Sequence, residues 1–145
     1  MPKDADTPVH RRRGARELLV MALYQWQLAG HSEVELCGQF AAKPEFPAVD
    51  RDYFREVLAL VLRDAESLDR EIARHADRNI DSTDAVSRAV LLLGLAELHG
   101  RRDVPTKVII NESVELAKRY GPVDCYRFVN AVLDRAAKQI DGRST

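Results

Sequence analysis

The strongest constraint on the fold is the stretch of residues 103–134, which reads as two amphipathic helices joined by a Gly-Pro corner. In the first helix, apolar and small side chains recur every three or four residues between Ile109 and Tyr120. This spacing predicts one broad buried face. Glu115 and Arg119 are four residues apart on the polar side, where such a pair stabilises a helix by roughly 0.2–0.5 kcal/mol. The stretch therefore predicts a helical hairpin.

The ends of the hairpin helices carry residues that are typical of caps and breaks. Asp103 or Val104 is expected to cap the first helix, and Pro105 suits its opening turn. Gly121 is expected to end that helix in the left-handed conformation, because Pro122 cannot continue it. These signals predict a sharp corner between the two helices.

The rest of the chain also has helical periodicity. Helices are expected over residues 11–29, 34–42, about 50–76, and 85–99. The segment 85–99 is apolar on most sides, which is typical of a central buried helix, and Gly94 would let a neighbour approach closely. Ser82, Thr83 or Asp84 can cap it, and the two prolines of residues 43–47 predict a loop.

No segment has the alternating pattern of a strand, so the predicted fold is all-α, a single-domain bundle of six or seven helices. The domain is expected to span residues 11–140, with a disordered tail at residues 1–10 and a polar tail at residues 141–145.

Composition excludes several classes of protein. The chain has 145 residues and a net charge of −1, and its two cysteines do not have metal-binding spacing. Its histidines and glycines form no HExxH, GxSxG or phosphate-binding motif, so no cofactor or catalytic residue is expected. No apolar run is long enough to cross a membrane, and no secretory signal is evident, so the cytoplasm is the expected location.

The first helix carries four arginines where helices usually place acids. Cations near a helix N-terminus cost about 0.3–1 kcal/mol each at low salt. Either this cost is offset elsewhere and the residues form an ordinary solvated face, or they bind phosphates. The residues concerned are Arg11, Arg12, Arg13 and Arg16.

Helical spacing continues the arginine row towards Tyr24 and Gln27, a pattern that suits single-stranded RNA, because phosphates pair with guanidinium groups and bases stack on aromatic rings. Trp26 lies on the apolar stripe and is expected in the core. We expect replacement of Arg13 and Arg16 to weaken RNA binding without loss of the fold.

A second candidate group lies at the corner of the hairpin, and its members are Lys118, Arg119, Asp124, Arg127 and Phe128.

Two residues of this second group have alternative roles. Asp124 can cap the last helix through its side chain, or accept hydrogen bonds from base edges, and the two roles are compatible. Phe128 can be a core residue or a platform for a base.

The run VPTKVIINESVELAKRYG, the following D-x-x-x-FVNxVLD and the opening RRRGARELLVMALYQWQ closely resemble the NusB family of bacterial transcription antitermination factors, over roughly residues 11–140. The resemblance implies a non-catalytic helical bundle that binds boxA RNA together with NusE, a small-subunit ribosomal protein. It implies assembly with other Nus factors and RNA polymerase on ribosomal RNA operons. It also implies that the arginine-rich first helix and the last hairpin form one RNA-binding surface.

The sequence departs from the family pattern at three positions. Ala131 follows Asn130 where the family usually has glycine. Leu92 and Ala96 stand where the central helix often carries an arginine and a tyrosine, which bears on any NusE contact within residues 79–103.

Two other functions remain open at this point. NusB-like domains also occur attached to RNA cytosine methyltransferases, but this chain has no glycine-rich cofactor loop after a strand. The other is a protein-binding helical adaptor, or a self-associating homodimer, with only incidental RNA contact.

Overall fold

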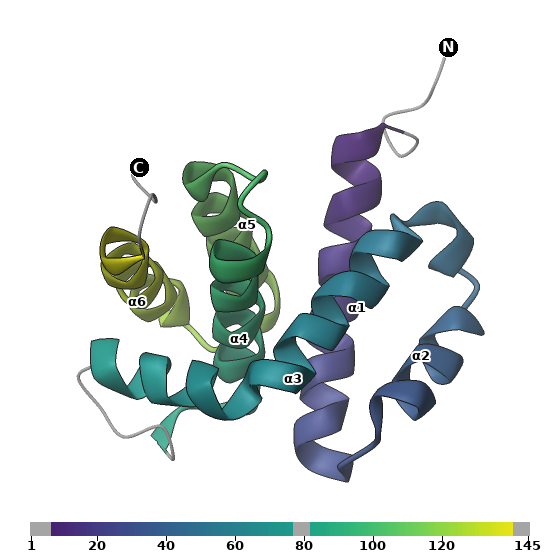
Figure 1. The fold of residues 1–145 in the computed structure, drawn as a ribbon, viewed down its shortest axis with the longest axis horizontal. Helices are drawn as coiled ribbons and strands as arrows, with labels where there is room; N and C mark the ends of the chain where they lie inside the picture. The colour runs from purple at the N-terminus through teal and green to yellow at the C-terminus, as the bar shows by residue number, and fades with distance from the viewer. Residues whose placement is uncertain (1–6, 77–81, 141–145) are drawn as a thin grey trace.

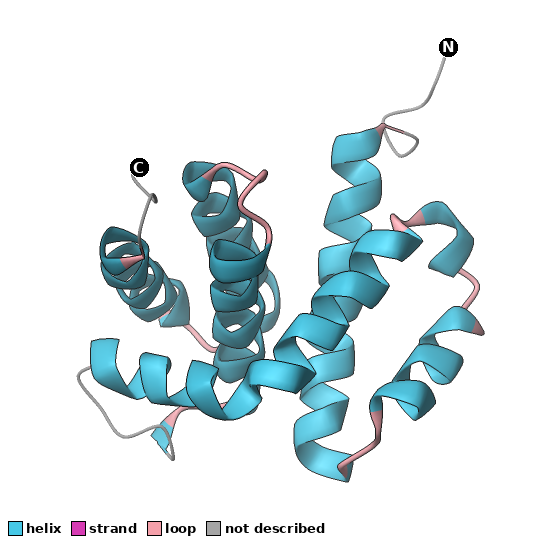
Figure 2. Ribbon diagram, viewed as in Figure 1, coloured by secondary structure: helices cyan, strands magenta, loops and turns pink. Residues whose placement is uncertain are grey.

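The computed structural model describes residues 7–76 and 82–140, and within them it contains α-helices and a short 3-10 helix but no strand (Figures 1 and 2). The elements are α1 (Pro8–Ala29), α2 (Glu33–Ala41), η2 (Phe46–Ala48), α3 (Arg51–His75), α4 (Ala85–Gly100), α5 (Thr106–Tyr120) and α6 (Cys125–Gln139). The all-α prediction is confirmed, with six α-helices in the described residues.

The first helix begins earlier than predicted. α1 starts at Pro8 rather than Arg11, because the Thr7 side chain accepts a hydrogen bond from the His10 backbone N–H and caps it. Gly30 ends α1 with a φ of 69°. The predicted tail at residues 1–10 therefore includes part of a helix, and residues 1–6 lie outside the described residues, as do residues 141–145.

Helix α4 is the centre of the bundle, as its apolar sequence predicts. It packs against α1, α3, α5 and α6, and Asp84 caps it by accepting from the Ser87 backbone N–H at 2.9 Å. A Cβ atom on Gly94 would lie 2.9 Å from Leu133 of α6 and 3.0 Å from Ser113 of α5. The glycine therefore permits the close approach of the two hairpin helices. Leu92, where the family often has arginine, is fully buried.

The long helix α3 connects the two sides of the molecule. It begins at Arg51 and is capped by Asp50, whose carboxylate accepts from the Tyr53 backbone N–H, and it packs against α1, α4 and α6 (Figure 1). The proline-containing segment before it holds η2 and places Phe46 edge-on against Phe54, with ring centroids 5.5 Å apart. This contact ties the connection between α2 and α3 to the core.

The predicted cap of α5 is wrong by a residue or two. Pro105 itself is the N-cap, Thr106 is the first helical residue, and no side chain caps this end. Val104 is buried instead, with 4% of its surface exposed.

The corner between α5 and α6 also differs from the prediction. Gly121 is extended, with φ −93° and ψ 173°, because a residue before proline avoids helical conformations. The left-handed residue is Asp124, with φ 65°, and its side chain makes no capping hydrogen bond to α6. Gly121 is needed for space, since a Cβ atom there would lie 2.4 Å from Cys125 Sγ and 2.9 Å from the Ala117 carbonyl oxygen.

Candidate nucleic-acid interface

The four arginines of α1 point to different neighbours, because successive positions on a helix are about 100° apart. Arg11 donates from Nη2 to the Val49 carbonyl at 3.0 Å. Arg12 forms an ion pair with Asp50 at 3.6 Å and lies over the Tyr53 ring, 4.2 Å from its centroid. These two arginines therefore tie the first turns of α1 to the start of α3.

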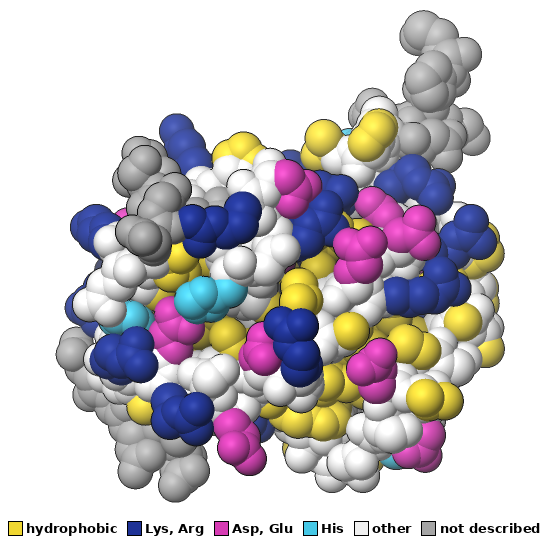
Figure 3. All heavy atoms as spheres, viewed as in Figure 1, with side chains coloured by type: hydrophobic (Ala, Val, Ile, Leu, Met, Phe, Trp, Pro, Cys, Tyr) yellow, Lys and Arg dark blue, Asp and Glu magenta, His cyan; other side chains and the backbone are white. Residues whose placement is uncertain are grey.

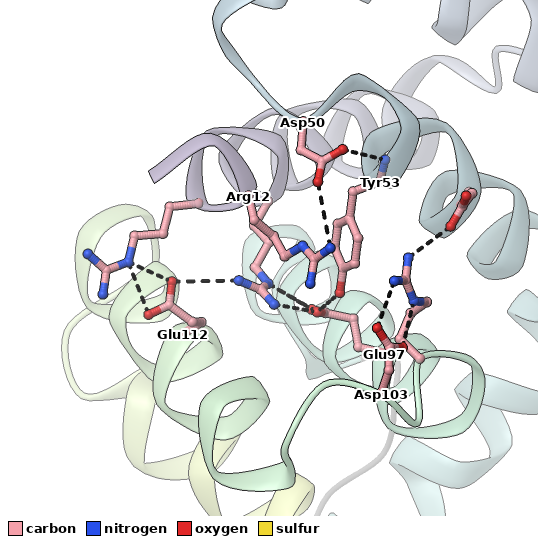
Figure 4. A network of polar contacts seen from close by, with 10 residues as sticks. Arg12, Asp50, Tyr53, Glu97, Asp103 and Glu112 are labelled. Atoms are coloured by element: carbon pink, nitrogen blue, oxygen red, sulfur yellow. Dashed lines mark hydrogen bonds and ion pairs between the residues drawn. The ribbon is translucent and has the colours of Figure 1, made fainter. Parts of the chain in front are cut away.

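Arg16 lies in the core rather than on a surface. Its side chain is 4% exposed, and it donates from Nε and Nη2 to Glu97 of α4 at 3.0 and 2.8 Å (Figure 4). Tyr53 of α3 also donates its hydroxyl to Glu97. The acid thus satisfies two buried donors from different helices, and the network joins α1, α3 and α4.

The protonation states of this network follow from its geometry. Burial alone would lower the pKa of Arg16, but the charge and hydrogen bonds of Glu97 outweigh it and the pKa is raised. Burial, followed by the charge of Glu97, raises the pKa of the Tyr53 hydroxyl. Both groups therefore keep their protons and remain donors to Glu97 at neutral pH.

A more exposed ion pair borders the network. Arg101 donates to Asp103 from Nε and Nη2, donates to Glu56 from Nη1, and lies over the Tyr53 ring at 4.7 Å. The hydrogen bonds from Arg101 lower the pKa of Asp103 to about 2. Arg101 therefore links the α4–α5 connection to α3.

Arg13 is the arginine of this group that reaches solvent most fully. Its side chain is 51% exposed, and its Nε donates to both carboxylate oxygens of Glu112 of α5, at 3.0 and 3.3 Å. Arg13 and the α5 residues Lys118 and Arg119 line one groove of about 560 Å³ between α1 and α5. The structure thus brings together basic residues that are about a hundred positions apart in the sequence.

The basic residues near the corner are exposed but have acidic neighbours. Arg119 donates to Glu17 of α1, and Lys118 lies 3.7 Å from Glu115. Arg127 has a 74% exposed side chain and lies 3.9 Å from Asp124. On the face shown in Figure 3, positive and negative side chains are likewise intermixed.

Tyr24 opens onto a second, apolar groove. The residue is 39% exposed, and the groove of about 440 Å³ is also lined by Met21, Leu28 and Tyr120. Tyr120 was predicted in the core, but it lies at this rim with 36% of its surface exposed. The groove offers aromatic and aliphatic surface beside the basic groove, since Arg119 and Tyr120 are adjacent.

Gln27 and Trp26 face another direction. The Gln27 amide donates to the Ala85 carbonyl at 2.8 Å and accepts from Arg88, so it ties α1 to α4. Trp26 is half-buried, packs against the core as predicted, and carries the Arg88 guanidinium over its ring at 5.4 Å. Phe128 is also half-buried against the core.

Sequence reasoning missed the acids that hold the arginines and one aromatic residue. Glu97, Glu112 and Glu17 come from three helices, and helical spacing carries no signal for partners across helices. Tyr126 lies under Lys118, with Nζ 5.0 Å from the ring centroid, and accepts a hydrogen bond from Arg127. Its position between Asp124 and Arg127 was the available signal.

Residues 7–76 and 82–140 contain no group of three or more His, Cys, Asp or Glu side chains arranged to hold a metal ion. Their helices include none that is long and apolar enough to cross a membrane.

Comparison with known proteins places the chain among similar sequences and folds. The NusB family model matches residues 13–138. The transcription antitermination protein NusB of Alcanivorax borkumensis is 44% identical over 134 residues, which cover 92% of this chain and 89% of the relative. The protein of the same name from Pectobacterium carotovorum is 46% identical over 133 residues, with 92% and 95% covered.

Solved structures agree with the sequence relatives. T. maritima NusB has a TM-score of 0.78 and 29% identity, with 88% of this chain and 91% of that chain covered. A chain from a complex of the antitermination factors NusB and NusE with double-stranded RNA has a TM-score of 0.75 and 29% identity, with 88% and 96% covered.

Proposed function

The chain belongs to the NusB family, and on that premise we propose that it is a transcription antitermination factor. In this role it binds boxA-type RNA in nascent ribosomal RNA transcripts together with NusE, and supports assembly of other Nus factors on RNA polymerase in the bacterial cytoplasm. It acts by binding, without catalysis. The observation that carries the proposal is the match to antitermination proteins over almost the whole chain.

The proposed RNA surface follows the groove between α1 and α5 and continues to the corner. Arg13, Lys118, Arg119 and Arg127 supply exposed cations within this region. The three guanidinium groups can bind phosphate oxygens through paired N–H donors, and the Lys118 ammonium can bind them as a point charge, so these side chains suit an RNA backbone.

Tyr24 supplies the base-binding part of the surface. Tyr24 is 39% exposed and lines the apolar groove together with Tyr120, the neighbour of Arg119 in the sequence. Stacking of a base on an aromatic ring contributes about 1–3 kcal/mol in single-strand binders. Asp124, which is exposed at the corner, is placed to accept hydrogen bonds from base edges. Phe128, which is half-buried against the core, is proposed to support the corner.

Three predicted site residues are assigned supporting roles. Arg16 and Gln27 hold α1 against α4, and Arg11 holds α1 against the segment before α3. Arg12, which is partly exposed beside Asp50, is proposed to add positive potential at the edge of the surface. The arginines of α1 therefore divide between fold and binding.

The proposal is tested by fluorescence anisotropy with a labelled boxA RNA, a scrambled RNA of the same composition, and the boxA duplex, each with and without NusE. We expect weak binding of the boxA strand alone and tighter binding with NusE. Affinity should fall steeply with salt, by a slope of roughly 0.7 per neutralised phosphate of a single strand. Equal binding of boxA and scrambled RNA in every condition would exclude sequence recognition, and tighter binding of the duplex would exclude single-strand recognition.

A second candidate function is a protein-binding or self-associating adaptor. The apolar groove at Tyr24, Met21 and Leu28 favours it, because exposed apolar surface of this kind is common in protein interfaces. Sedimentation velocity over a range of concentrations distinguishes the two. A salt-insensitive dimer that excludes RNA would support the adaptor, whereas a monomer with salt-sensitive RNA binding would support the antitermination factor.

A further inference from the structure

The two exposed arginines of the basic groove are held by acids in different ways. Arg13 uses its Nε to bind Glu112, and within the described residues its terminal Nη1 and Nη2 have no hydrogen-bond partner. Arg119 instead uses a terminal nitrogen, Nη1, to bind Glu17. The Nη1–Nη2 edge of Arg13 is therefore open, whereas that of Arg119 is partly occupied.

Glu112 is itself firmly placed. Its side chain is 16% exposed, and it lies 3.8 Å from Nη1 of Arg16 in addition to binding Arg13. Arg16 is fixed in turn by Glu97 in the core, so alternating charges lead from α4 out to the groove (Figure 4). The position of Arg13 is thus set by the core of the bundle through Glu112.

This arrangement suits phosphate binding. A guanidinium has five N–H donors, and it binds a phosphate through two of them at one edge. With Nε occupied by Glu112, the Nη1–Nη2 edge of Arg13 is the edge presented to solvent. A long side chain loses rotamer freedom when it binds, and holding it in advance reduces that loss.

We propose that Glu112 is a positioning residue for RNA binding, which holds Arg13 by Nε and presents its Nη1–Nη2 edge to an RNA phosphate. Glu17 has the opposite effect, because it occupies one of the two donors at the Nη1–Nη2 edge of Arg119, and a phosphate that uses this edge must displace it. This inference rests on the proposed RNA-binding function. It predicts effects of opposite sign for two glutamates that line the same groove.

Simple electrostatics makes a different prediction. If only net charge mattered, removal of either acid would tighten RNA binding. Under the proposal, Glu112→Ala weakens binding even though it removes a negative charge. Glu112→Gln keeps a carbonyl oxygen that can accept from Arg13 Nε, so it is expected to retain most of the affinity.

The experiment measures anisotropy of a labelled boxA RNA with the full chain and NusE. We expect Arg13→Ala and Glu112→Ala each to weaken binding about threefold to tenfold, the range of a single charge-assisted contact near a surface. Glu17→Gln should tighten binding about twofold, a size typical of an exposed ion pair. In the Arg13→Ala background, Glu112→Ala should cause no further loss.

Several outcomes would overturn the inference. Binding by Glu112→Ala that equals or exceeds the unmodified chain would exclude positioning, provided that Arg13→Ala weakens binding. If Glu112→Ala weakens RNA binding by the same factor in the Arg13→Ala background as in the unmodified chain, Glu112 has a purely structural role. If Arg13→Ala has no effect, both the inference and the place of Arg13 in the RNA surface are wrong. If the unmodified chain binds no RNA, the proposed function fails.

A measurement without RNA tests the geometry directly. The Arg13 Nε–H resonance of the ¹⁵N-labelled chain should be slowed in solvent exchange by Glu112. We expect this protection to disappear in Glu112→Ala and to persist in Glu112→Gln, while the Arg16 Nε–H stays protected by Glu97. Loss of the Arg16 signal as well would show that the substitution disturbs the core, and would overturn the positioning role.

Discussion

Arg16 and Arg127 are the same kind of residue in opposite surroundings. Arg16 is buried and is bound by Glu97, whereas Arg127 is 74% exposed beside Asp124 at 3.9 Å. Removing a partner from a buried ion pair leaves an unpaired charge in the core, but an exposed pair contributes little. The comparison shows that burial and partners, rather than residue type, decide whether an arginine is part of the core or is exposed to solvent.

The largest expected effect is the loss of the buried pair. We expect Glu97→Ala and Arg16→Ala each to lower the free energy of unfolding by about 3–5 kcal/mol, because each strands a buried charge. Arg127→Ala should change it by less than about 0.5 kcal/mol. Urea unfolding followed by circular dichroism measures this free energy for all three variants. Equal losses in Arg16→Ala and Arg127→Ala would contradict the contrast between the buried and the exposed arginine.

This expectation corrects the one drawn from the sequence, that Arg16 can be removed without loss of the fold. Any loss of RNA binding by Arg16→Ala must therefore be separated from unfolding. Arg16→Met, which keeps much of the side-chain volume, together with Glu97→Leu removes both charges. This double variant should have a higher free energy of unfolding than either single alanine variant. If its free energy of unfolding is as low as that of the single alanine variants, a stranded charge is not the cause of their instability.

The second effect concerns the corner that carries Arg127. Gly121→Ala would place a Cβ atom 2.4 Å from Cys125 Sγ and 2.9 Å from a backbone oxygen, which cannot move away easily. We expect a loss of about 1–3 kcal/mol. Gly38→Ala in α2 is the matched control, because its Cβ would meet nothing within 4 Å, and a helical alanine is favoured by about 0.5–1 kcal/mol. Similar effects at both glycines would refute a steric role for Gly121.

The third effect separates binding from stability. Arg127→Ala is expected to weaken binding of boxA RNA roughly threefold to tenfold, and to lower the salt slope by about 0.7, the contribution of one single-strand phosphate. Titrations at four salt concentrations measure the slope. Arg63→Ala is the control, since Arg63 is exposed and paired with Asp64 on α3, away from the proposed surface. A slope that changes equally in both variants would show a general charge effect.

The sequence predicted helices well because helical periodicity is a local signal. The predicted elements correspond to α1–α6, and the apolar pattern of residues 85–99 identified the central helix α4. Gly121 shows the limit, since its role depends on Cys125 in the next helix rather than on its own φ. Local signals located the corner but gave the wrong conformation for it.

The candidate site could be predicted only in part, for the same reason. The arginine-rich start of α1 was visible in the sequence, but the partner of Arg16 is 81 residues away and the partner of Arg119 is 102 residues away. Arg119 was expected to pair with Glu115 along its own helix, and it donates to Glu17 of α1 instead. Packing of helices decides such pairs, and it also decides which arginines remain exposed. The RNA contacts themselves stay a prediction.

The smallest effect is the pH dependence of the Arg101–Asp103 pair, which lies between the two extremes. Arg101 is mostly buried, but Asp103 is 60% exposed, so solvent screens the pair and its contribution is expected to be only about 0.5 kcal/mol or less. The pKa of Asp103 is lowered to about 2 in the folded chain, below the value of about 4 for an unfolded aspartate. The stabilisation is therefore fully present above about pH 4 and is lost as the pH falls towards 2.

Urea unfolding of the unmodified chain and of Asp103→Asn, between pH 2.5 and 7, measures this contribution. The free energies of unfolding of the two chains should differ slightly at neutral pH. This difference should shrink below about pH 4, and also in 1 M salt, where the Debye length is about 3 Å. A difference that persists unchanged at pH 2.5 would show that Asp103 acts through hydrogen bonds that do not depend on its charge. A difference as large as that for Glu97→Ala would mean that exposure does not weaken the pair, and would break the contrast between buried and exposed arginines.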